Sequence, residues 1–477
     1  GMLAFNTWER IPQNTVTPAM RTKALRAHHI YDIKRDGSAK NRVVVNGRQQ
    51  HADTYTDTTS PVASQLQLRT LLAIIAYRQY HTVQMDLTNA YLHASIQDKV
   101  YIYIPDGFPG KGEIALLVKA AYGTKQGARR FYDHVATIFE QIGLKQCPNE
   151  PCLHRYLDNT GECFVLTYVD DALITGTRQA VQHIQAKLSE HFKCKFNEPK
   201  DFLGLDVTIV NKGKLTLSMS SFTKKMTDTL QIQQWKGDIA TPGRTDMKIL
   251  KTDNKLTDDS YRSKVGSLNW LTMGLRYDLV YSTKELSRVL QGPTATALQL
   301  LERTLQYTTQ TKDAYLEYDY DKMVNFTPPL TRKKPTDTND VYDTSKYNIQ
   351  DEIPQHDDNE RTQDYRYKGK QMTLTCETDI DLGGQKETRQ STSGYMLYLN
   401  GALIHWRGRT EKIIIQSTAA GEYVALSRGN TACKFVRDIL EFYGNTNSLY
   451  HLYTDNQAAE HIATQPTMNE HSRSIDI

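Results

Sequence analysis

Two adjacent aspartates, Asp170 and Asp171, interrupt an otherwise apolar stretch of the sequence. Residues 164–166 (FVL) precede them and residues 172–174 (ALI) follow, which predicts two buried strands joined by a tight turn. Two carboxylates buried in such a hairpin are costly to desolvate unless a cation neutralises them. An ordinary surface turn is the alternative for an Asp-Asp pair, and the apolar flanks argue against it.

A third acid, Asp86, ends the apolar strand predicted over residues 83–87. If this strand neighbours the hairpin, Asp86 and Asp170 converge from separate strands. Mg²⁺ prefers a few carboxylates together with water and phosphate oxygens. Two such ions about 4 Å apart serve an in-line phosphoryl displacement, so this acidic set predicts a two-metal phosphoryl-transfer site for Mg²⁺, with Mn²⁺ as a substitute.

Four further acids stand in distinct settings near the end of the sequence. Asp379 ends an alternating strand, Glu422 lies in a predicted helix, Asp455 follows a short strand and Asp476 is next to last. One acid on a strand, one on a helix and two from later elements is the arrangement that a two-metal nuclease needs. Asp381 is the main rival to Asp379 as a ligand.

The hydrophobic pattern predicts the elements that would position these acids. Helical spacing indicates helices over residues 64–80, 123–143, 178–192, 261–310 and 419–438, with Thr177 as a candidate cap. Alternation and turn residues indicate strands over residues 32–45 (a hairpin), 202–219 (a second hairpin), 372–378, 395–406 and 412–416. Residues 321–370 are polar and poor in aliphatic side chains, which predicts a flexible linker.

Composition excludes several classes of protein. The net charge is only +4 over 477 residues, so it does not by itself indicate a nucleic-acid partner. Six cysteines without a CxxC pair argue against a disulfide scaffold and a structural zinc site, and favour reduced, intracellular thiols. The longest aliphatic run is Leu71–Ala76, far short of the roughly 20 residues of a membrane helix, so no membrane partner is expected.

A set of motifs in order resembles the reverse transcriptases of copia-type long-terminal-repeat retrotransposons. The YVDD box at 168–171 and the strand 83–92 (VQMDLTNAYL) resemble their catalytic segments. The other similar segments are 40–47 (KNRVVVNG), 117–126 (LVKAAYGTKQ), 202–206 (FLGLD), 261–268 (YRSKVGSL) and 286–288 (LSR). The resemblance implies that Asp86, Asp170 and Asp171 bind two Mg²⁺.

The same resemblance implies how a deoxynucleoside triphosphate is held. Arg42, with Lys34 or Arg35, would clasp the triphosphate, since guanidinium and ammonium groups suit its charge. Gln126 would line the nucleotide pocket, and Tyr91 would clash with a 2′-hydroxyl and so select deoxynucleotides. A plain core tyrosine is the alternative for Tyr91. Lys125 is a candidate contact to the template, and Asn46 stands where the family has lysine, so it is assigned no phosphate role.

The C-terminal segments resemble the RNase H unit of the same elements. The similar strings are 378–384 (TDIDLGG), 389–395 (RQSTSGY), 401–406 (GALIHW), 420–423 (AGEY), 453–457 (YTDNQ) and 474–477 (SIDI). Carried over, they make Asp379, Glu422, Asp455 and Asp476 the metal ligands. Leu382 and Ala420 depart from the family pattern at positions that are not proposed ligands. Because the sequence stops just after Asp476, this residue is expected to fray and weaken the nuclease.

The resemblance therefore implies an α+β multidomain protein: a right-hand polymerase, a linker and an RNase H-like α/β domain. Fingers and palm would span 1–240, thumb 241–320, linker 321–370 and RNase H 371–477. The expected partners are an RNA template, a DNA or tRNA primer and the RNA–DNA hybrid, with a second copy or the element's integrase and capsid proteins also considered. The expected location is a cytoplasmic virus-like particle, with nuclear entry of the complex.

Two other functions stay open at this point. One is a reverse transcriptase of another lineage, such as an intron-encoded enzyme, against which the RNase H-like unit argues. The other is a nucleic-acid-binding relic of such an element that has lost catalysis. Every proposed ligand acid is present in the sequence, which favours an active enzyme over the relic.

Overall fold

The computed structural model describes residues 2–33, 37, 39–159, 161–232, 237–244, 246–329, 371–385, 387–445 and 450–464. The chain divides into two compact units. The first unit contains Gly1–Ser64 and Tyr80–Pro199, and the second contains Gln65–Gln79 and Lys200–Ile477. Within the described ranges, no helix has the length and apolar character needed to span a membrane.

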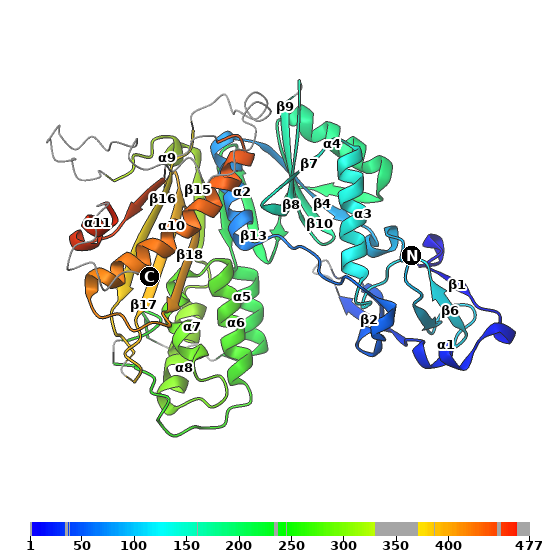
Figure 1. Ribbon diagram of the computed structural model, residues 1–477, viewed down its shortest axis with the longest axis horizontal. Helices are drawn as coiled ribbons and strands as arrows, with labels where there is room; N and C mark the ends of the chain where they lie inside the picture. The colour runs from blue at the N-terminus through cyan, green and yellow to red at the C-terminus, as the bar shows by residue number, and fades with distance from the viewer. Residues whose placement is uncertain are drawn as a thin grey trace, which may run out of the picture. The chain divides into compact units, whose positions relative to one another are not determined.

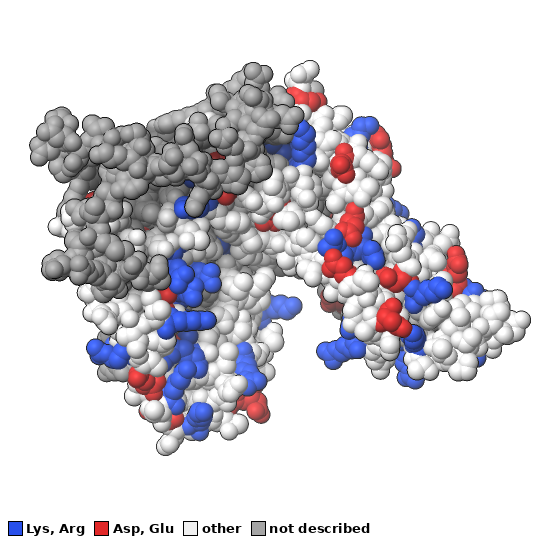
Figure 2. Space-filling model, in the orientation of Figure 1, with Lys and Arg blue, Asp and Glu red and all other residues white. Residues whose placement is uncertain are grey.

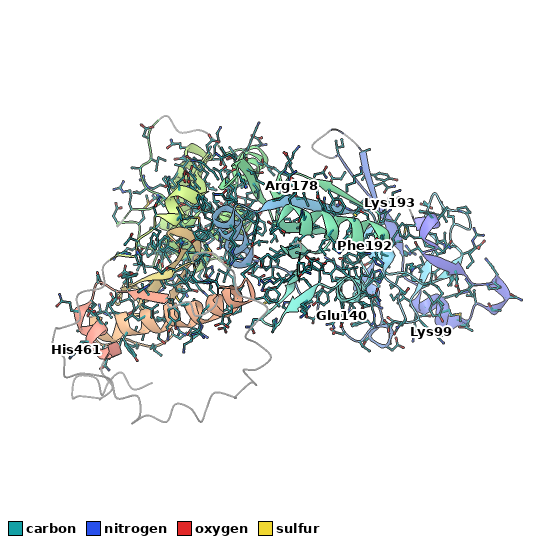
Figure 3. All side chains as sticks on the ribbon, turned by 90° about the horizontal axis from the view of Figure 1, so that it is seen from above. Lys99, Glu140, Arg178, Phe192, Lys193 and His461 are labelled. Atoms are coloured by element: carbon teal, nitrogen blue, oxygen red, sulfur yellow. The ribbon has the colours of Figure 1, made fainter. Side chains whose placement is uncertain are left out.

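The first unit is built on a six-stranded antiparallel sheet with the order β11-β4-β10-β9-β8-β7. Its strands are β4 (His81–Leu87), β7 (Lys145–Cys147), β8 (Glu150–Asp158), β9 (Gly161–Tyr168), β10 (Asp171–Gly176) and β11 (Cys194–Asn197). Apolar residues of α3 (Gly127–Gln141) and α4 (Arg178–His191) share one core with these strands. Figure 1 shows both helices beside the sheet. Figure 3 labels Arg178, where α4 begins, and Phe192, which follows its end.

Two smaller sheets complete the first unit. Strands β1 (Trp8–Arg10), β6 (Ile114–Leu117) and β5 (Tyr101–Tyr103) form one, and the hairpin of β2 (Ala27–Ile33) and β3 (Ala39–Val45) forms the other. Gly37 turns this hairpin with a φ of +78°, which suits glycine because it has no Cβ. Val45 and Leu25 bury their side chains in a core shared with the three-stranded sheet, so the hairpin base is anchored.

The second unit begins with α2 (Gln65–Arg78), whose side chains are buried on nearly every side. A four-stranded antiparallel sheet follows, formed by β12 (Asp201–Phe202), β13 (Leu205–Asn211), β14 (Lys214–Ser218) and β15 (Tyr315–Asp319). The helices are α5 (Ser220–Thr229), α6 (Tyr261–Gly274), α7 (Val280–Ser287), α8 (Ala295–Gln310) and α9 (Tyr320–Val324), with the short turn η6 (Tyr277–Leu279) before α7. The predicted helical character of residues 261–310 is confirmed.

A further sheet in the second unit has the order β18-β17-β16-β19. Its strands are β16 (Leu374–Asp381), β17 (Thr392–Leu399), β18 (Ala402–Thr410) and β19 (Tyr450–Tyr453), and β19 alone among them pairs in parallel. The long helix α10 (Thr418–Phe442) packs on β16 and β17, and α11 (Gln457–Thr464) packs on α10 (Figure 1). This order brings the ends of β16 and β19 together.

The predicted single strand over 395–406 is wrong, and so is the strand over 412–416. A hairpin turn at Asn400 and Gly401 divides the former into β17 and β18, with φ values of +47° and +78°. An Asn-Gly pair favours this left-handed turn, and it was the signal that the prediction overlooked. Residues 412–416 form no strand.

The predicted domain bounds remain predictions. Residues 330–370, most of the predicted linker, lie outside the described residues, whereas Tyr320–Val324 at its start form α9. The contacts also group α2 with the second unit, although it lies within the segment predicted as fingers and palm.

Candidate active sites

The first acidic site lies at one edge of the six-stranded sheet. Asp86 on β4 is the register partner of Asp171 on the adjacent strand β10. The backbone N–H of Leu87 donates to the carbonyl oxygen of Asp170 at 3.1 Å, which ties the turn to the end of β4. The predicted convergence of Asp86 with the Asp170-Asp171 pair is therefore what the strand order produces.

The turn that holds the pair is conformationally strained. Val169 has a φ of +55°, a left-handed conformation that is rare for a β-branched residue. Such a conformation costs roughly 1–3 kcal/mol and persists only where the surrounding structure fixes it. Here β9 and β10 pair along their whole length, so the strands impose the turn and with it the positions of Asp170 and Asp171.

The expectation that these carboxylates are buried is wrong. Val165, Leu166 and Leu173 on the flanking strands are fully buried, but Asp86 is exposed and the Asp170-Asp171 pair is half-buried. Asp86 is the next-to-last residue of β4 and Asp171 the first of β10, so the acids lie at the edge of the sheet, where solvent reaches their side chains. The fold can therefore form with the carboxylates ionised and still leave them open to a cation and a substrate.

Two tyrosines in ring contact border Asp170. The rings of Tyr91 and Tyr122 lie 4.3 Å apart between centroids, and Tyr91 also stacks on Phe131 at 5.7 Å. Burial raises the pKa of Tyr122, and the charge of Asp170 with a hydrogen bond to it raises that pKa further, while Arg42 lowers it. Arg42 on β3 is thus the cation near this pair.

Tyr91 lies on a short 3-10 turn, Ala90–His93, directly after β4. Its side chain is half-buried, and burial followed by the charge of Asp170 raises its pKa. Because the ring is held between two other aromatic rings, it can present a fixed surface beside the acids. Its predicted role as a gate against the 2′-hydroxyl stays a prediction.

The Gln126 side chain is enclosed within the protein and hydrogen-bonded there. Its side chain is fully buried, and its amide carbonyl accepts a hydrogen bond from Gln50 at 2.8 Å. Its amide nitrogen donates to the carbonyl oxygen of Thr54 at 2.9 Å and to Asp98 at 3.2 Å. Its polar groups are thus used within the protein, and its predicted place in the nucleotide pocket stays a prediction.

The other predicted nucleotide contacts are placed in part. Lys34 and Arg35 lie outside the described residues. The Lys125 ammonium donates to the Tyr55 hydroxyl at 2.8 Å and lies 4.6 Å from the centre of its ring. Sequence reasoning assigned no role to Tyr122, although its segment was singled out, because nothing local to the sequence places its hydroxyl beside Asp170.

The second acidic site lies on the β16–β19 sheet. Asp379 on β16, Glu422 on α10 and Asp455 after β19 each offer a carboxylate oxygen, and these oxygens lie within 4.8 Å of one another. Among the described residues this is the group with the spacing of a metal site. Three of the four predicted ligands therefore meet, Asp381 is not among them, and Asp476 lies outside the described residues.

The pKa of Glu422 is shifted by the other acids of the second site. It is only 3% exposed, and burial raises its pKa, with the negative charges of Asp379 and Asp455 raising it further. The Thr454 hydroxyl donates a 3.4 Å hydrogen bond to the Glu422 carboxylate, which opposes that rise. Three converging like charges are unfavourable alone and become favourable around a cation.

A cavity of about 770 Å³ opens in front of the second site. Asp379, Asp381 and Asp455 line one side of it, together with Glu377. Because the cavity reaches the acids from solvent, an extended polymer can approach them along the sheet.

Comparison with known proteins agrees with this geometry. Residues 5–242 match the family described as reverse transcriptase (RNA-dependent DNA polymerase), and this range contains Asp86, Asp170 and Asp171. This region is a reverse transcriptase domain. The match covers the part of the chain where the strained hairpin and its partner strand lie.

The relatives of this reverse transcriptase are Pol polyproteins of transposons. The chain is 26% identical over 98% of its length to the retrovirus-related Pol polyprotein from transposon RE2 of Arabidopsis thaliana, covering 30% of that protein. It is 23% identical over 95% of its length to that from transposon TNT 1-94 of Nicotiana tabacum, covering 32%. The Ty1-LR3 Gag-Pol polyprotein of Saccharomyces cerevisiae is 25% identical over 67% of the chain and 19% of that protein.

These relatives are copia-type polyproteins, so the predicted lineage is confirmed and the alternative of another lineage is set aside. The reverse transcriptase chain spans about a third or less of the length of the relatives named above. A solved structure of the foamy viral protease–reverse transcriptase in complex with double-stranded DNA superposes with a TM-score of 0.51 at 10% identity. It covers 98% of this chain and 62% of that one, which supports the predicted fold class.

Proposed function

We propose that this chain copies RNA and DNA templates into DNA and cuts the RNA strand of RNA–DNA hybrids, at two separate acidic sites. The pairing of Asp86 with Asp171 beside the Asp170 turn supports the first activity. The meeting of three acids within 4.8 Å supports the second. A two-metal mechanism explains why each activity needs carboxylates from separate elements.

The first site fits divalent cations because its carboxylates are ionisable, convergent and open to solvent. Asp86, Asp170 and Asp171 would hold two Mg²⁺, or Mn²⁺, which when bound favour ionisation of the primer 3′-hydroxyl and offset charge on the leaving pyrophosphate. Arg42, the cation beside Tyr122, would pair with the triphosphate of the incoming deoxynucleotide. Tyr91 would lie under its sugar.

The second site fits the same cations because, after burial, the charges of Asp379 and Asp455 raise the pKa of Glu422, and a cation between the three carboxylates would relieve this repulsion. Asp379, Glu422 and Asp455, with Asp476 as the predicted fourth ligand, would hold two Mg²⁺. When bound, these ions favour attack of water on the RNA phosphate and stabilise the leaving 3′-oxygen. The Thr454 hydroxyl keeps the Glu422 carboxylate oriented toward the other acids.

Basic side chains offer a surface for nucleic acid. Figure 2 shows Lys and Arg gathered over the α5–α8 helices of the second unit, where Lys224, Lys225 and Arg262 are exposed. Such residues bind phosphates without reading sequence, as an A-like hybrid requires. Binding is therefore expected to weaken steeply with salt. The solved foamy viral relative, described in complex with double-stranded DNA, is consistent with a duplex partner.

Primer extension tests the first activity. A DNA primer on an RNA template is extended with deoxynucleotides and Mg²⁺ by the wild type, by Asp170→Asn and by Asp106→Asn. Asp106 is an exposed aspartate paired with Lys111, so its variant controls for the loss of one charge. Extension is expected from the wild type and Asp106→Asn only. Full extension by Asp170→Asn would refute the assignment of that carboxylate.

Cleavage of a labelled RNA–DNA hybrid tests the second activity. Glu422→Gln is expected to abolish cutting while primer extension continues, because Glu422 lies among the second set of acids. Glu441→Gln is the matched control, since Glu441 is exposed on the same helix. Loss of both activities in Glu422→Gln would mean that the two sites cannot be separated in this way.

The relic without catalysis is the second candidate, and the same assays distinguish it. Hybrid binding without extension or cutting by the wild type would favour the relic or the absence of a partner subunit. We also propose that the chain uses a DNA or tRNA primer and works in a virus-like particle, and that the complex enters the nucleus. The proposed protein partners are integrase, capsid proteins or a second copy of the chain.

A further inference from the structure

The cavity in front of the second acidic site has a wall that the RNase H-like sheet does not supply. Opposite the acids, its lining comes from η6 and α7, with Tyr277, Tyr281 and Lys284 as the large side chains. These residues belong to the helical region predicted as the thumb, about a hundred residues earlier in the chain than Asp379. The nuclease site is therefore bounded by two parts of the sequence.

Direct contacts fix this wall against the sheet. The Trp406 indole N–H on β18 donates to the carbonyl oxygen of Thr272 at 2.9 Å, and the Lys284 ammonium donates to the Thr392 hydroxyl at 2.7 Å. Gly408 allows the close approach, because a Cβ there would lie 2.7 Å from a methyl group of Val280. Helix α7 therefore lies at a set distance from the strands that carry the acids.

Two tyrosines on this wall are exposed despite their size. Tyr277 is 43% exposed and Tyr281 is 53% exposed, and both line the cavity. The Tyr277 ring packs edge-on against Trp406 at 5.8 Å between centroids. Asp381 lines the same cavity as Tyr281, and its charge helps raise the pKa of Tyr281, after burial and Glu285.

Aromatic surface of this kind suits a nucleotide. A tyrosine presents an apolar ring and a polar tip, and it loses little entropy when it is held in place. Basic groups lie near these rings: the Lys284 ammonium is 4.8 Å from the centre of the Tyr281 ring, where it also pairs with Glu285 at 2.9 Å, and the exposed Arg407 on β18 lines the same cavity. A lining that combines acids with aromatic rings and basic groups suits a polynucleotide whose scissile phosphate lies at the acids.

We propose that Tyr277 and Tyr281 of η6 and α7 are substrate-binding residues of the nuclease site, contacting nucleotides of the RNA–DNA hybrid across from Asp379 and Asp455. The inference rests on the proposed hybrid cleavage and names residues outside the RNase H-like sheet that it requires. It follows that the sheet and α10 alone form an incomplete site. The helical region predicted as the thumb completes it.

Kinetics on a preformed hybrid test the inference. The DNA strand carries a blocked 3′ end so that no extension competes, and the full chain is compared with Tyr281→Ala and the Tyr277→Ala, Tyr281→Ala double variant. Loss of aromatic contacts is expected to raise KM about tenfold and to change kcat by less than about twofold, because an aromatic–base contact contributes roughly 1–3 kcal/mol. Tyr315→Ala is the matched control, since Tyr315 is 59% exposed on β15 and does not line the cavity.

An unchanged KM in the tyrosine variants would overturn the inference, and so would faster cleavage, which would mean that the wall only covers the site. Tyr281→Phe keeps the ring and is expected to retain most of the binding. Melting curves of the variants check that each is folded, which is expected because the substituted side chains are exposed.

Photocrosslinking gives a readout that does not depend on cleavage. A benzophenone amino acid in place of Tyr281 is expected to crosslink to the hybrid, whereas the same group in place of Tyr315 is not. Crosslinking at 281 in a wild-type background that fails to cut RNA would count against the proposed nuclease activity and leave the binding surface standing. Absence of the crosslink at 281 would remove the inference even if RNA is cut.

Discussion

The Arg69 guanidinium on α2 lies 4.0 Å from the centre of the Trp406 ring on β18. Arg69 is only 2% exposed and donates to the carbonyl oxygens of Ile404, Met273 and Gly274, at 2.7, 3.0 and 2.5 Å. One buried side chain thus connects α2, the end of α6 and the sheet formed by β16–β19. This explains why the second unit includes α2.

Arg69→Met is expected to destabilise the second unit by about 3–5 kcal/mol, because it leaves three buried carbonyl oxygens without their donor. Urea unfolding measures the loss. Burial lowers the pKa of Arg69 to about 10, so the guanidinium stays charged at neutral pH and the bonds persist there. The exposed Arg262→Met is the control, and an equal loss in both variants would contradict the role assigned to Arg69.

Glu150→Gln is expected to change how the stability of the first unit depends on pH. Burial raises the pKa of Glu150 from 4.5 to about 7, so the folded state holds a proton that the unfolded state has released. Wild-type stability should therefore fall as pH rises from about 4.5 to 7 and then level off. The glutamine variant lacks this fall, and above pH 7 it should gain on the order of 2 kcal/mol over the wild type.

Urea unfolding at pH 5 and pH 8 measures that difference. The control is Glu190→Gln, because Glu190 is exposed and pairs with Lys187 on α4. A constant difference between Glu150→Gln and the wild type at both pH values would show that the carboxyl does not titrate in this range.

Gly123→Ala is expected to disrupt the first unit. Gly123 has a φ of +89°, and a Cβ there would lie 2.0 Å from the carbonyl oxygen of Val45. The clash falls on backbone that also pairs through the Val45 N–H and the Tyr122 carbonyl, so neither side can move away easily. We expect a loss of more than about 3 kcal/mol, or failure to fold.

Gly112→Ala separates the cost of the left-handed backbone from the cost of the steric clash. Gly112 has a similar φ of +79° but open space around it. It should cost only about 1 kcal/mol from the backbone conformation. Thermal melting of both variants measures the difference, and similar melting temperatures would mean that the close approach to Val45 is unimportant.

Tyr91→Ala is expected to increase ribonucleotide incorporation about tenfold, because removing a steric clash is worth roughly 1–3 kcal/mol. Primer extension with single ribonucleotides and deoxynucleotides gives the ratio. Tyr91→Phe keeps the ring that packs against Tyr122 and should behave as the wild type. An unchanged ratio in the alanine variant would assign Tyr91 to the core alone.

Local signals were sufficient to predict the acids of both sites. Asp86 and the Asp170-Asp171 pair each end an apolar strand, and alternation with turn residues predicts such strands well. The same signals could not show that the strands end at the surface, so the predicted burial of the acids was wrong. At Asn400 the local sequence did contain the needed information. The Asn-Gly turn signal was present, but the apolar residues on either side outweighed it.

The long-range packing could not be predicted from the sequence. Nothing near Arg69 indicates that its partners lie on α6 and β18, and an arginine in an amphipathic helix is normally expected on the exposed side. Gln126 was assigned to a pocket by its motif, but its hydrogen bonds to Gln50 and Thr54 depend on loops far from it in sequence. The same is true of Tyr281, whose place beside the acids follows only from the packing of α7 on the sheet.

The position of α2 has a consequence for the order in which the chain can fold as it is synthesised. Arg69 leaves the ribosome 335 residues before Ile404, whose carbonyl oxygen it binds. Until β18 is synthesised, the Arg69 guanidinium cannot bind it and the apolar side chains of α2 cannot pack on it. Helix α2 therefore stays without this packing partner until a further 335 residues have been synthesised, which makes the folding of the second unit late and sensitive to interruption.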